Sequence, residues 1–196
     1  MGKAIAIRNN FMSRIASRTV SYLSPEEVSQ IADCVKDGRN GERNYLLILL
    51  LFQTGLRVSE GLSLTPSKIT RYNNGYIVKI VGKGNKPRTV ATPELIANKL
   101  IAFAYNRHLG PNDRIFDINR KSAWRIIKQA GRKAGIEKRI YPHLLRHADA
   151  IERLRQTHNP KALQLHLGHN SILMSMRYLS TLSEEAAIKE MQTVQF

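Results

Sequence analysis

The spacing of apolar residues along the chain predicts a mostly helical protein. In most segments apolar positions recur every three to four residues, and proline, glycine or capping residues bound these segments. The clearest start is "SPEE", in which Ser24 caps, Pro25 takes the first helical position and Glu27 completes a capping box. We expect helices over residues 24–37, 42–54 (closed by Gly55), 94–106, 121–134, 143–157, 159–167 (closed by Gly168), from 170 or 171 onward, and in 183–196.

One segment has the pattern of β-strands. Residues 75–92 contain two runs rich in β-branched residues, separated by a Gly-Lys-Gly-Asn turn, which predicts a hairpin. The expected fold class is therefore mainly α with a small antiparallel β-hairpin or sheet (α+β). No internal repeat or clear linker divides the chain, so one domain is expected for the body of the protein.

Cysteine content and apolar run length exclude several classes of protein. Cys34 is the single cysteine, so neither a disulfide within the chain nor a cysteine-rich zinc site is available, and Cys34 is expected to be a small core residue. The longest apolar run, residues 45–52, is far shorter than the roughly 20 residues of a membrane span. We expect an intracellular, cytoplasmic protein that needs no membrane partner.

The charge balance points to a polyanionic partner. The chain has 31 Lys+Arg against 15 Asp+Glu, a net charge of +16, which favours nucleic acid over a membrane surface. Residues 1–20 contain basic residues and no acid, which suggests an arm that reaches toward phosphates; an ordinary frayed terminus is the alternative. Residues 183–196 are slightly acidic.

The segment 121–134 combines an apolar face with a basic stripe. The apolar positions fall on one helical face, and the cations recur at i, i+4, i+7 and i+11 on another. The apolar positions are Ala123, Ile126, Ile127, Ala130 and Ala134, and the cations are Lys121, Arg125, Lys128 and Arg132. A solvated face usually mixes signs and this one does not, so we predict contact with DNA phosphates.

The stretch "IYPHLLRHADA" (140–150) holds two histidines and an arginine within five residues. His143 and Arg146 are three residues apart and share one helix face. An arginine fork binds phosphate oxygens bidentately, and histidine exchanges protons near neutral pH. A His-x-x-Arg pair alone is more often a surface or capping pair. The pair indicates a phosphate site only together with the order of further motifs.

Five motifs in one order make the chain similar to a known family. With "TGLRVSE", "GKGNKPR", "HLLRH", "LGHNSI" and "RY", residues 21–182 resemble the catalytic domain of the tyrosine recombinases, which include phage integrases and Xer-type recombinases. The expected organisation is a basic arm over 1–20, the catalytic domain over 21–182 and a helical tail over 183–196. Most members carry an N-terminal DNA-clamping domain that 20 residues cannot form. The chain is thus either a fragment or a naturally single-domain recombinase, as the fimbrial inversion enzymes are.

The resemblance implies which residues hold the scissile phosphate. Arg57 and Arg146 match the family's two arginines, which stabilise charge in the transition state. His169 matches the position that hydrogen-bonds the phosphate, and Glu60 the acidic position that orders the first arginine. His147 is expected to be a structural hydrogen-bonding residue. Further DNA contacts are expected from Lys86 and Arg88 in the hairpin and from the basic stripe.

The resemblance also implies the chemical steps. Tyr178 matches the nucleophile, whose phenolate attacks phosphorus to give a 3′-phosphotyrosyl link and a free 5′-hydroxyl. Lys83 matches the general acid for the departing 5′ oxygen, and His143 the residue that helps accept the tyrosine proton. Neither metal, ATP nor another cofactor is implied. The implied partners are double-stranded DNA and further copies of the chain, as a tetramer on two DNA sites, with an accessory DNA-bending protein left open.

Besides the short chain, the sequence departs from the family pattern next to Arg146, and this leaves alternatives open. Ala148 and Asp149 stand where the family usually has a hydroxyl residue and an apolar one. Asp149 either pairs with a nearby cation or signals altered packing or a decaying gene, and the presence of all six central positions argues against decay. The rival functions are a type IB-like topoisomerase that relaxes DNA without sequence choice, and a non-catalytic DNA-binding regulator. The sequence gives neither the target site nor the biological outcome of recombination.

Overall fold

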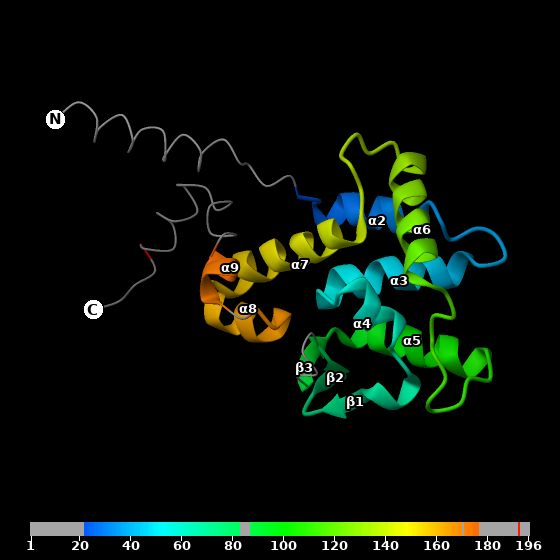
Figure 1. Cartoon of the computed structure of the whole chain (residues 1–196), viewed down its shortest axis with the longest axis horizontal. Coiled ribbons are helices and arrows are strands. Elements are labelled where there is room, and N and C mark those ends of the chain that lie inside the picture. Colours follow the sequence, from blue (N-terminus) through cyan, green and yellow to red (C-terminus); the bar gives the residue numbers. More distant parts are fainter. Residues whose placement is uncertain (1–21, 83–86, 170, 177–191, 193–196) are drawn as a thin grey trace.

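The computed structural model describes residues 22–82, 87–169, 171–176 and 192, and Figure 1 draws the remainder as a grey trace. In chain order the elements are α2 (Pro25–Asp33), α3 (Gly41–Thr54), α4 (Val58–Leu62), the 3-10 turn η1 (Pro66–Lys68), β1 (Ile69–Tyr72), β2 (Gly75–Val81), β3 (Pro87–Thr92), α5 (Glu94–Asn106), α6 (Arg120–Lys133), α7 (Pro142–Thr157), α8 (Pro160–Leu167) and α9 (Ile172–Met176). The expected fold class, mainly α with a small antiparallel sheet, is confirmed.

Helix α3 forms the centre of the molecule. Its leucine-rich sequence is buried on most sides, because α2, α5, α7 and β3 all pack against it. Leu47, Ile48, Leu50 and Leu51 have no exposed surface, and each fully buried aliphatic side chain favours folding by about 1.5–3 kcal/mol. Figure 1 shows α2, α6 and α7 on one side of α3 and the sheet with α5 on the other. The end of α3 thus lies where both halves of the fold meet.

Helix α2 begins as expected and ends earlier. The side chain of Ser24 accepts from the Glu27 main-chain N–H (3.2 Å), and Glu27 Oε2 accepts from the Ser24 N–H (2.8 Å). The expected end near Asp37 is wrong, since the helix stops at Asp33. The chain has to reverse here, and the Lys36 carbonyl packs so closely on Gly41 that a Cβ there would overlap it. Cys34, the C-cap, is half-buried against the core.

Helices α3 and α8 both end at a glycine. Gly55 closes α3 with φ +58°, and Gly168 closes α8 with φ +65°, as the sequence predicts. Asn159 caps α8 by accepting from the Ala162 N–H (2.9 Å). Helix α7 begins at Pro142, close to the expected position. These ends bring the carbonyls of Gly55 and Leu167 to Arg146 of α7.

The sheet has one more strand than the expected hairpin. Its order is β1-β2-β3, with both pairs antiparallel and with Val78 opposite both Ile69 and Val90. The sequence did not predict β1, because its four residues are too short and too polar to show alternation. The hairpin tip, with Lys83 and Lys86, lies outside the described residues, as do the expected arm 1–20 and all of the expected tail except Gln192. Within the described part of the chain, no helix is long and apolar enough to cross a membrane.

Candidate active site

The candidate site residues converge where the end of α3, the start of α7 and the end of α8 meet. Arg57 is the N-cap of α4, directly after the turn at Gly55. His143 and Arg146 lie on the first turns of α7, and His169 follows the glycine that ends α8. The charges of Arg57 and Arg146 both act on His143 and on His169, which places these four residues in one cluster.

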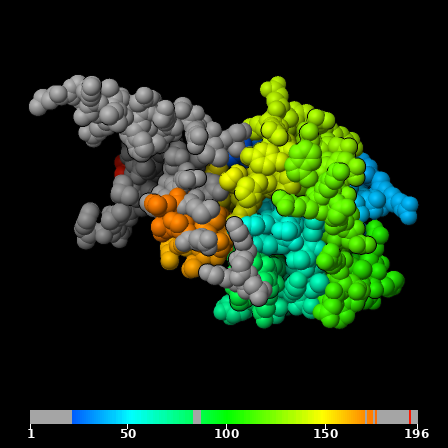
Figure 2. Space-filling view, viewed as in Figure 1, coloured from blue at the N-terminus to red at the C-terminus, as the bar shows by residue number. Residues whose placement is uncertain are grey.

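A groove runs beside this cluster. It has a volume of about 420 Å³, and α4, α6 and α7 contribute its lining. The polar and aromatic lining residues are Arg57, Ser59, Arg120, Trp124, Tyr141 and His143. On the face shown in Figure 2, atoms of the α6–α7 region (yellow-green and yellow) border the cyan surface of α3 and α4. The groove is cationic and open, as a site for a phosphodiester has to be.

A buried carboxylate holds two arginines at the edge of the groove. Glu60, 5% exposed, accepts from the Arg57 main chain (2.7 Å) and from Arg57 Nη1 (2.9 Å). It also accepts from both terminal nitrogens of Arg88, at 3.1 and 3.0 Å. Burial lowers the pKa of Arg88, and the charge of Glu60 opposes that shift. The Arg57 side chain keeps 31% of its surface exposed, so it can still reach a ligand.

Arg88, for which we predict a DNA contact, is largely buried, and its contact with DNA stays a prediction. Its side chain is only 11% exposed and is paired with Glu60, and β3, which carries Arg88, packs against α3 and α8. A Cβ on Gly168 would also overlap the Arg88 side chain. The Glu60–Arg88 pair was not predicted from the sequence, because the two residues are 28 positions apart and no local pattern links them.

Arg146 is held by main-chain carbonyls. Its side chain is 3% exposed and donates to the carbonyl of Gly55 through Nη1 and to that of Leu167 through Nη2 (2.7 Å). Leu144 and Leu145 on the same helix are buried in the core, as expected for the apolar back of α7. The carbonyls come from the ends of α3 and α8, so the position of Arg146 depends on how these two ends sit against α7.

The site histidines are biased toward the neutral form. Desolvation, followed by the charges of Arg146 and Arg57, lowers the pKa of His143. Burial and then His143 and Arg146 lower the pKa of His147 to about 4, and the two rings lie edge to face with centroids 5.1 Å apart. Burial, followed by Arg146, Arg57 and Arg88, lowers the pKa of His169 to about 4. At neutral pH these rings can therefore accept as well as donate a hydrogen bond.

One ring nitrogen of His169 has a hydroxyl partner. Nδ1 of His169 lies 2.9 Å from the hydroxyl of Ser175, which is fully buried in α9. When Ser175 donates to Nδ1, the ring proton is on Nε2, and Nε2 can then donate to a phosphate oxygen. Ser175 was not found from the sequence; its position six residues after His169 is the one signal that could have indicated it.

The basic stripe of α6 is largely exposed. Lys121, Arg125 and Arg132 are exposed, while Lys128 is partly buried with Nζ 4.9 Å from the centroid of the Trp124 ring. The opposite face carries Ala123, Ile127 and Ala130 into the core, as expected. Contact of the stripe with DNA remains a prediction. Tyr178, Lys83 and Lys86 lie outside the described residues.

Comparison with known proteins identifies the family. The model of the phage integrase family matches residues 21–185, and the chain belongs to this family. A tyrosine recombinase of Pseudothermotoga lettingae is 30% identical over 176 residues, which cover 88% of this chain and 60% of that protein. Tyrosine recombinase XerA of Pyrococcus furiosus is 32% identical over 165 residues, 80% of this chain and 56% of that protein. The chain thus spans little more than half the length of these relatives.

Solved structures with similar folds come from the same family. The XerH site-specific recombinase bound to palindromic difH substrate, in a post-cleavage complex, has a TM-score of 0.73 and 26% identity and covers 89% of this chain and 53% of that one. The XerA recombinase has a TM-score of 0.72 and 28% identity, covering 90% of this chain and 66% of that one. The catalytic domain of bacteriophage HP1 integrase has a TM-score of 0.66 and 25% identity, covering 86% and 94%.

Proposed function

We propose that this chain carries the catalytic part of a site-specific DNA recombinase, which cleaves and rejoins DNA strands through a phosphotyrosyl link to Tyr178. The observation that carries the proposal is the convergence of Arg57, His143, Arg146 and His169 beside one cationic groove. Membership of the phage integrase family supports the reaction class, and the solved complex of XerH with its DNA substrate supports DNA as the partner.

Arg57 and Arg146 stabilise the negative charge that develops on the phosphate during the reaction. Two guanidinium groups near a nonbridging oxygen pair stabilise the pentacoordinate transition state, in which the phosphate gains negative charge. Neutral His169 adds a hydrogen bond from Nε2 because Ser175 occupies Nδ1. Glu60 keeps Arg57 oriented while leaving part of its side chain exposed. This division of roles makes Arg57, Arg146 and His169 the phosphate-binding residues.

The proton steps balance without an external energy source. Tyr178 loses its phenolic proton with the help of His143, and the phenolate oxygen bonds to phosphorus. The bond from phosphorus to the 5′ oxygen breaks, and Lys83 supplies the proton for that oxygen. One phosphodiester is exchanged for another, so attack by a 5′-hydroxyl on the phosphotyrosine reseals the strand and returns the tyrosine.

Assembly on DNA is a further part of the proposal. The family resemblance implies four protomers on two DNA sites, with C-terminal segments passed between neighbours. Gel filtration of DNA complexes formed by the full chain and by a chain ending at Leu182 tests the role of the tail. Smaller complexes from the shorter chain are expected, and complexes of unchanged size would remove the exchange from the proposal.

Covalent trapping tests the activity. Duplexes from the DNA flanking the coding sequence, nicked at successive positions so that a short 5′ fragment diffuses away, are incubated with the native chain or Tyr178→Phe in EDTA. A protein–DNA band on a denaturing gel with the native chain alone is expected. A bandshift without a covalent band from either protein would favour a non-catalytic DNA-binding regulator. Relaxation of supercoiled DNA without any site requirement would favour the topoisomerase.

A further inference from the structure

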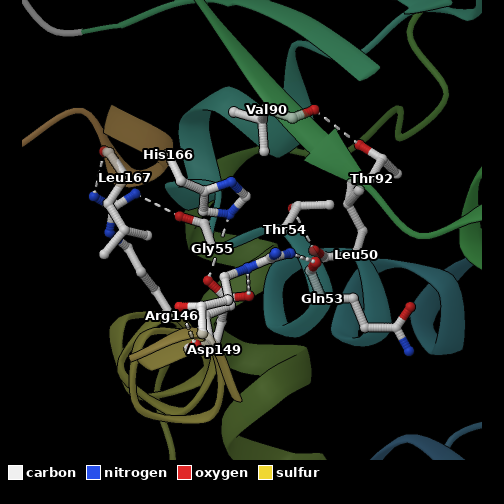
Figure 3. A network of polar contacts seen from close by, with 12 residues as sticks. Leu50, Gln53, Thr54, Gly55, Val90, Thr92, Arg146, Asp149, His166 and Leu167 are labelled. Atoms are coloured by element: carbon white, nitrogen blue, oxygen red, sulfur yellow. Dashed lines mark hydrogen bonds and ion pairs between the residues drawn. The ribbon is translucent and has the colours of Figure 1, made fainter. Parts of the chain in front are cut away.

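Behind Arg146, two buried side chains from different helices face each other. Asp149, 3% exposed, lies one helical turn after Arg146 on α7, and its Oδ1 accepts from Arg153 Nε at 2.7 Å. Its Oδ2 lies 3.7 Å from Nε2 of His166, whose side chain is 10% exposed. Neither of these two atoms has a hydrogen-bond partner among the described residues. Figure 3 shows the two side chains pointing at one another between α7 and α8.

Asp149 and His166 lie next to the residues that bind Arg146. Gly55, whose carbonyl accepts from Arg146, has its Cα against the Asp149 carboxylate, so a Cβ at Gly55 would overlap Oδ2. Leu167, whose carbonyl also accepts from Arg146, directly follows His166. Asp149 and His166 therefore lie directly beside the two residues whose carbonyls bind the arginine.

The charged groups around the pair come from three elements. Helix α7 supplies Arg146 and Arg153, and β3 supplies Arg88, which acts on His166. Helix α3 supplies main-chain groups: the Gln53 carbonyl accepts from Arg153 Nη2 (2.6 Å), and Thr54 forms a main-chain hydrogen bond with His166. The charges of Arg153, Arg146 and Arg88 act on the pair. Asp149 is thus an acid among cations.

Elementary hydrogen-bond chemistry requires one proton for this arrangement. The His166 ring donates to the Thr54 carbonyl, and since Nε2 has no partner this bond uses Nδ1–H, so Nε2 of the neutral ring is an acceptor. An ionised Asp149 oxygen and this nitrogen are then both acceptors, so they repel and both stay unsatisfied in a buried place. With one proton between them, either group donates to the other and the gap can shorten to hydrogen-bond length. Two protons would leave a buried imidazolium beside three arginines.

We propose that Asp149 is a positioning residue for Arg146, because Asp149 and His166 share one proton whose hydrogen bond fixes the end of α8 against α7. The inference rests on the proposed function in that Arg146 is taken to bind the scissile phosphate. Asp149 acts through the carbonyls of Gly55 and Leu167 and touches no reacting atom.

The pKa values of Asp149 and His166 predict how the binding of Arg146 to phosphate changes with pH. Burial, opposed by Arg153 and Arg146, raises the pKa of Asp149 to about 6, and burial, with Arg153 and Arg88, lowers the pKa of His166 to about 3. The single proton is therefore on Asp149 below about pH 6. Above that pH the bond is lost and a negative charge remains next to Arg146. Both changes weaken the hold on a phosphate.

The test compares the native chain with Asp149→Asn over pH 5 to 8. Asparagine keeps the size, accepts from Arg153 and donates its amide N–H to His166 at every pH. The rate of covalent adduct formation on nicked duplex should be similar for the two proteins near pH 5. The variant should then become faster than the native chain, by at most about tenfold per pH unit above 6. A ratio of rates that is constant with pH would overturn the proposal.

The matched control is Glu152→Gln, a carboxylate-to-amide change on the same helix. Glu152 is bonded to Gln156 and lies outside the pair, so its ratio to the native chain should not change with pH. A pH-dependent ratio in this control equal to that of Asp149→Asn would also overturn the assignment, because the effect would then not be specific to Asp149.

A second measurement does not depend on activity. In the native chain labelled with ¹⁵N-histidine, the ring signals of His166 and His169 should shift together with a midpoint near pH 6, and both shifts should vanish in Asp149→Asn. His166→Gln identifies the His166 signals. Unchanged His166 signals from pH 4 to 8 in the native chain would overturn the shared proton. Absence of adduct from the native chain together with the expected shifts would instead contradict the proposed function.

Discussion

At the scale of single residues, the site is organised by buried groups that neutralise or orient its cations. Glu60 makes hydrogen bonds to Arg57 and Arg88 at once, and it is nearly inaccessible to water. A buried ion pair gains little over an apolar pair, but removing one partner leaves uncompensated charge. The Glu60 cluster is therefore a point where one substitution affects both stability and the orientation of Arg57.

Glu60→Gln should be strongly destabilising. The substitution leaves two guanidinium groups without their shared carboxylate, and loss of one partner of a buried pair costs about 3–5 kcal/mol. Glu27→Gln is the matched control, because Glu27 pairs with the partly exposed Lys138, a contact expected to contribute about 1 kcal/mol or less. Chemical denaturation measures both. Equal losses of unfolding free energy in the two variants would contradict the role given to Glu60.

Ser175→Ala should slow strand cleavage while Ser175→Thr should retain it. Alanine removes the hydroxyl that occupies Nδ1 of His169, so the proton is no longer directed to Nε2. A hydrogen bond of about 1.4 kcal/mol corresponds to about a tenfold change in rate. The initial rate of adduct formation at pH 7 is the measurement. A threonine variant as slow as the alanine variant would show that the hydroxyl does not act this way.

At the scale of elements, the contact between α7 and α8 decides the geometry of Arg146. The guanidinium binds carbonyls at the ends of α3 and α8, and both ends are glycine-terminated turns. Asp149 on α7 and His166 on α8 form a contact between these two helices. The pair therefore also makes a contribution to stability whose pH dependence can be worked out.

Asp149→Asn and His166→Gln should change the pH dependence of stability in opposite directions. The pKa of Asp149 is raised to about 6, so its stabilisation is present at low pH and lost as pH rises through 6. The pKa of His166 is lowered to about 3, so its stabilisation is present above the unfolded pKa and lost as pH falls toward 3. Between about pH 4 and 6 these slopes cancel in the native chain.

In each single variant, unfolding free energy should depend on pH through the titration of the remaining partner alone. Relative to the native chain, unfolding free energy should rise with pH by about 1.4 kcal/mol per unit in Asp149→Asn and fall by the same amount in His166→Gln. Urea denaturation at pH 4, 5 and 6 measures both slopes. Variants that track the native chain at all three values would show that the two groups do not titrate as a pair.

The elements themselves were predictable where local chemistry decides them. The ends of α3 and α8 follow from glycine, and the start of α2 follows from its capping box. The end of α2 was missed because the reversal at Gly41 is a tertiary contact. Helix α4, only five residues long, and strand β1 were missed because their patterns are too short to read. Short elements are defined by the packing around them.

The site was predictable as a set of motifs but not as a set of contacts. Motif order gave Arg57, His143, Arg146 and His169, and the fold brings them together. The pairs Glu60–Arg88 and Asp149–His166 join residues that are far apart in the chain. The expectation that Asp149 pairs with a nearby cation agrees with its bond to Arg153, whereas its contact with His166 was not foreseen.

At the scale of the whole molecule, excess positive charge is the dominant feature. The net charge of +16 gives a long-range attraction for DNA, and α6 concentrates exposed cations next to the groove. Each phosphate neutralised by a cation releases counterions, so affinity for DNA should fall steeply with salt. The stripe on α6 is expected to supply part of that dependence.

Replacing Lys121, Arg125 and Arg132 together by glutamine should lower the salt dependence of DNA binding. The slope of log affinity against log salt should decrease by about 0.9 for each phosphate that the variant no longer neutralises. The control replaces Lys99, Arg107 and Arg114 by glutamine, which removes the same charge from α5 and the loop after it. Fluorescence anisotropy at several salt concentrations measures the slopes. Equal effects in both triple variants would mean that net charge, not α6, carries the dependence.

The central claim is that the cluster around Arg57 and Arg146 activates Tyr178 as the nucleophile. The most direct test is mass spectrometry of the trapped adduct after digestion of both protein and DNA. The expected result is a nucleotide phosphate attached to the peptide containing Tyr178, present in EDTA and absent from Arg146→Ala. A nucleotide on any other residue, or an adduct undiminished by loss of Arg146, would contradict the claim.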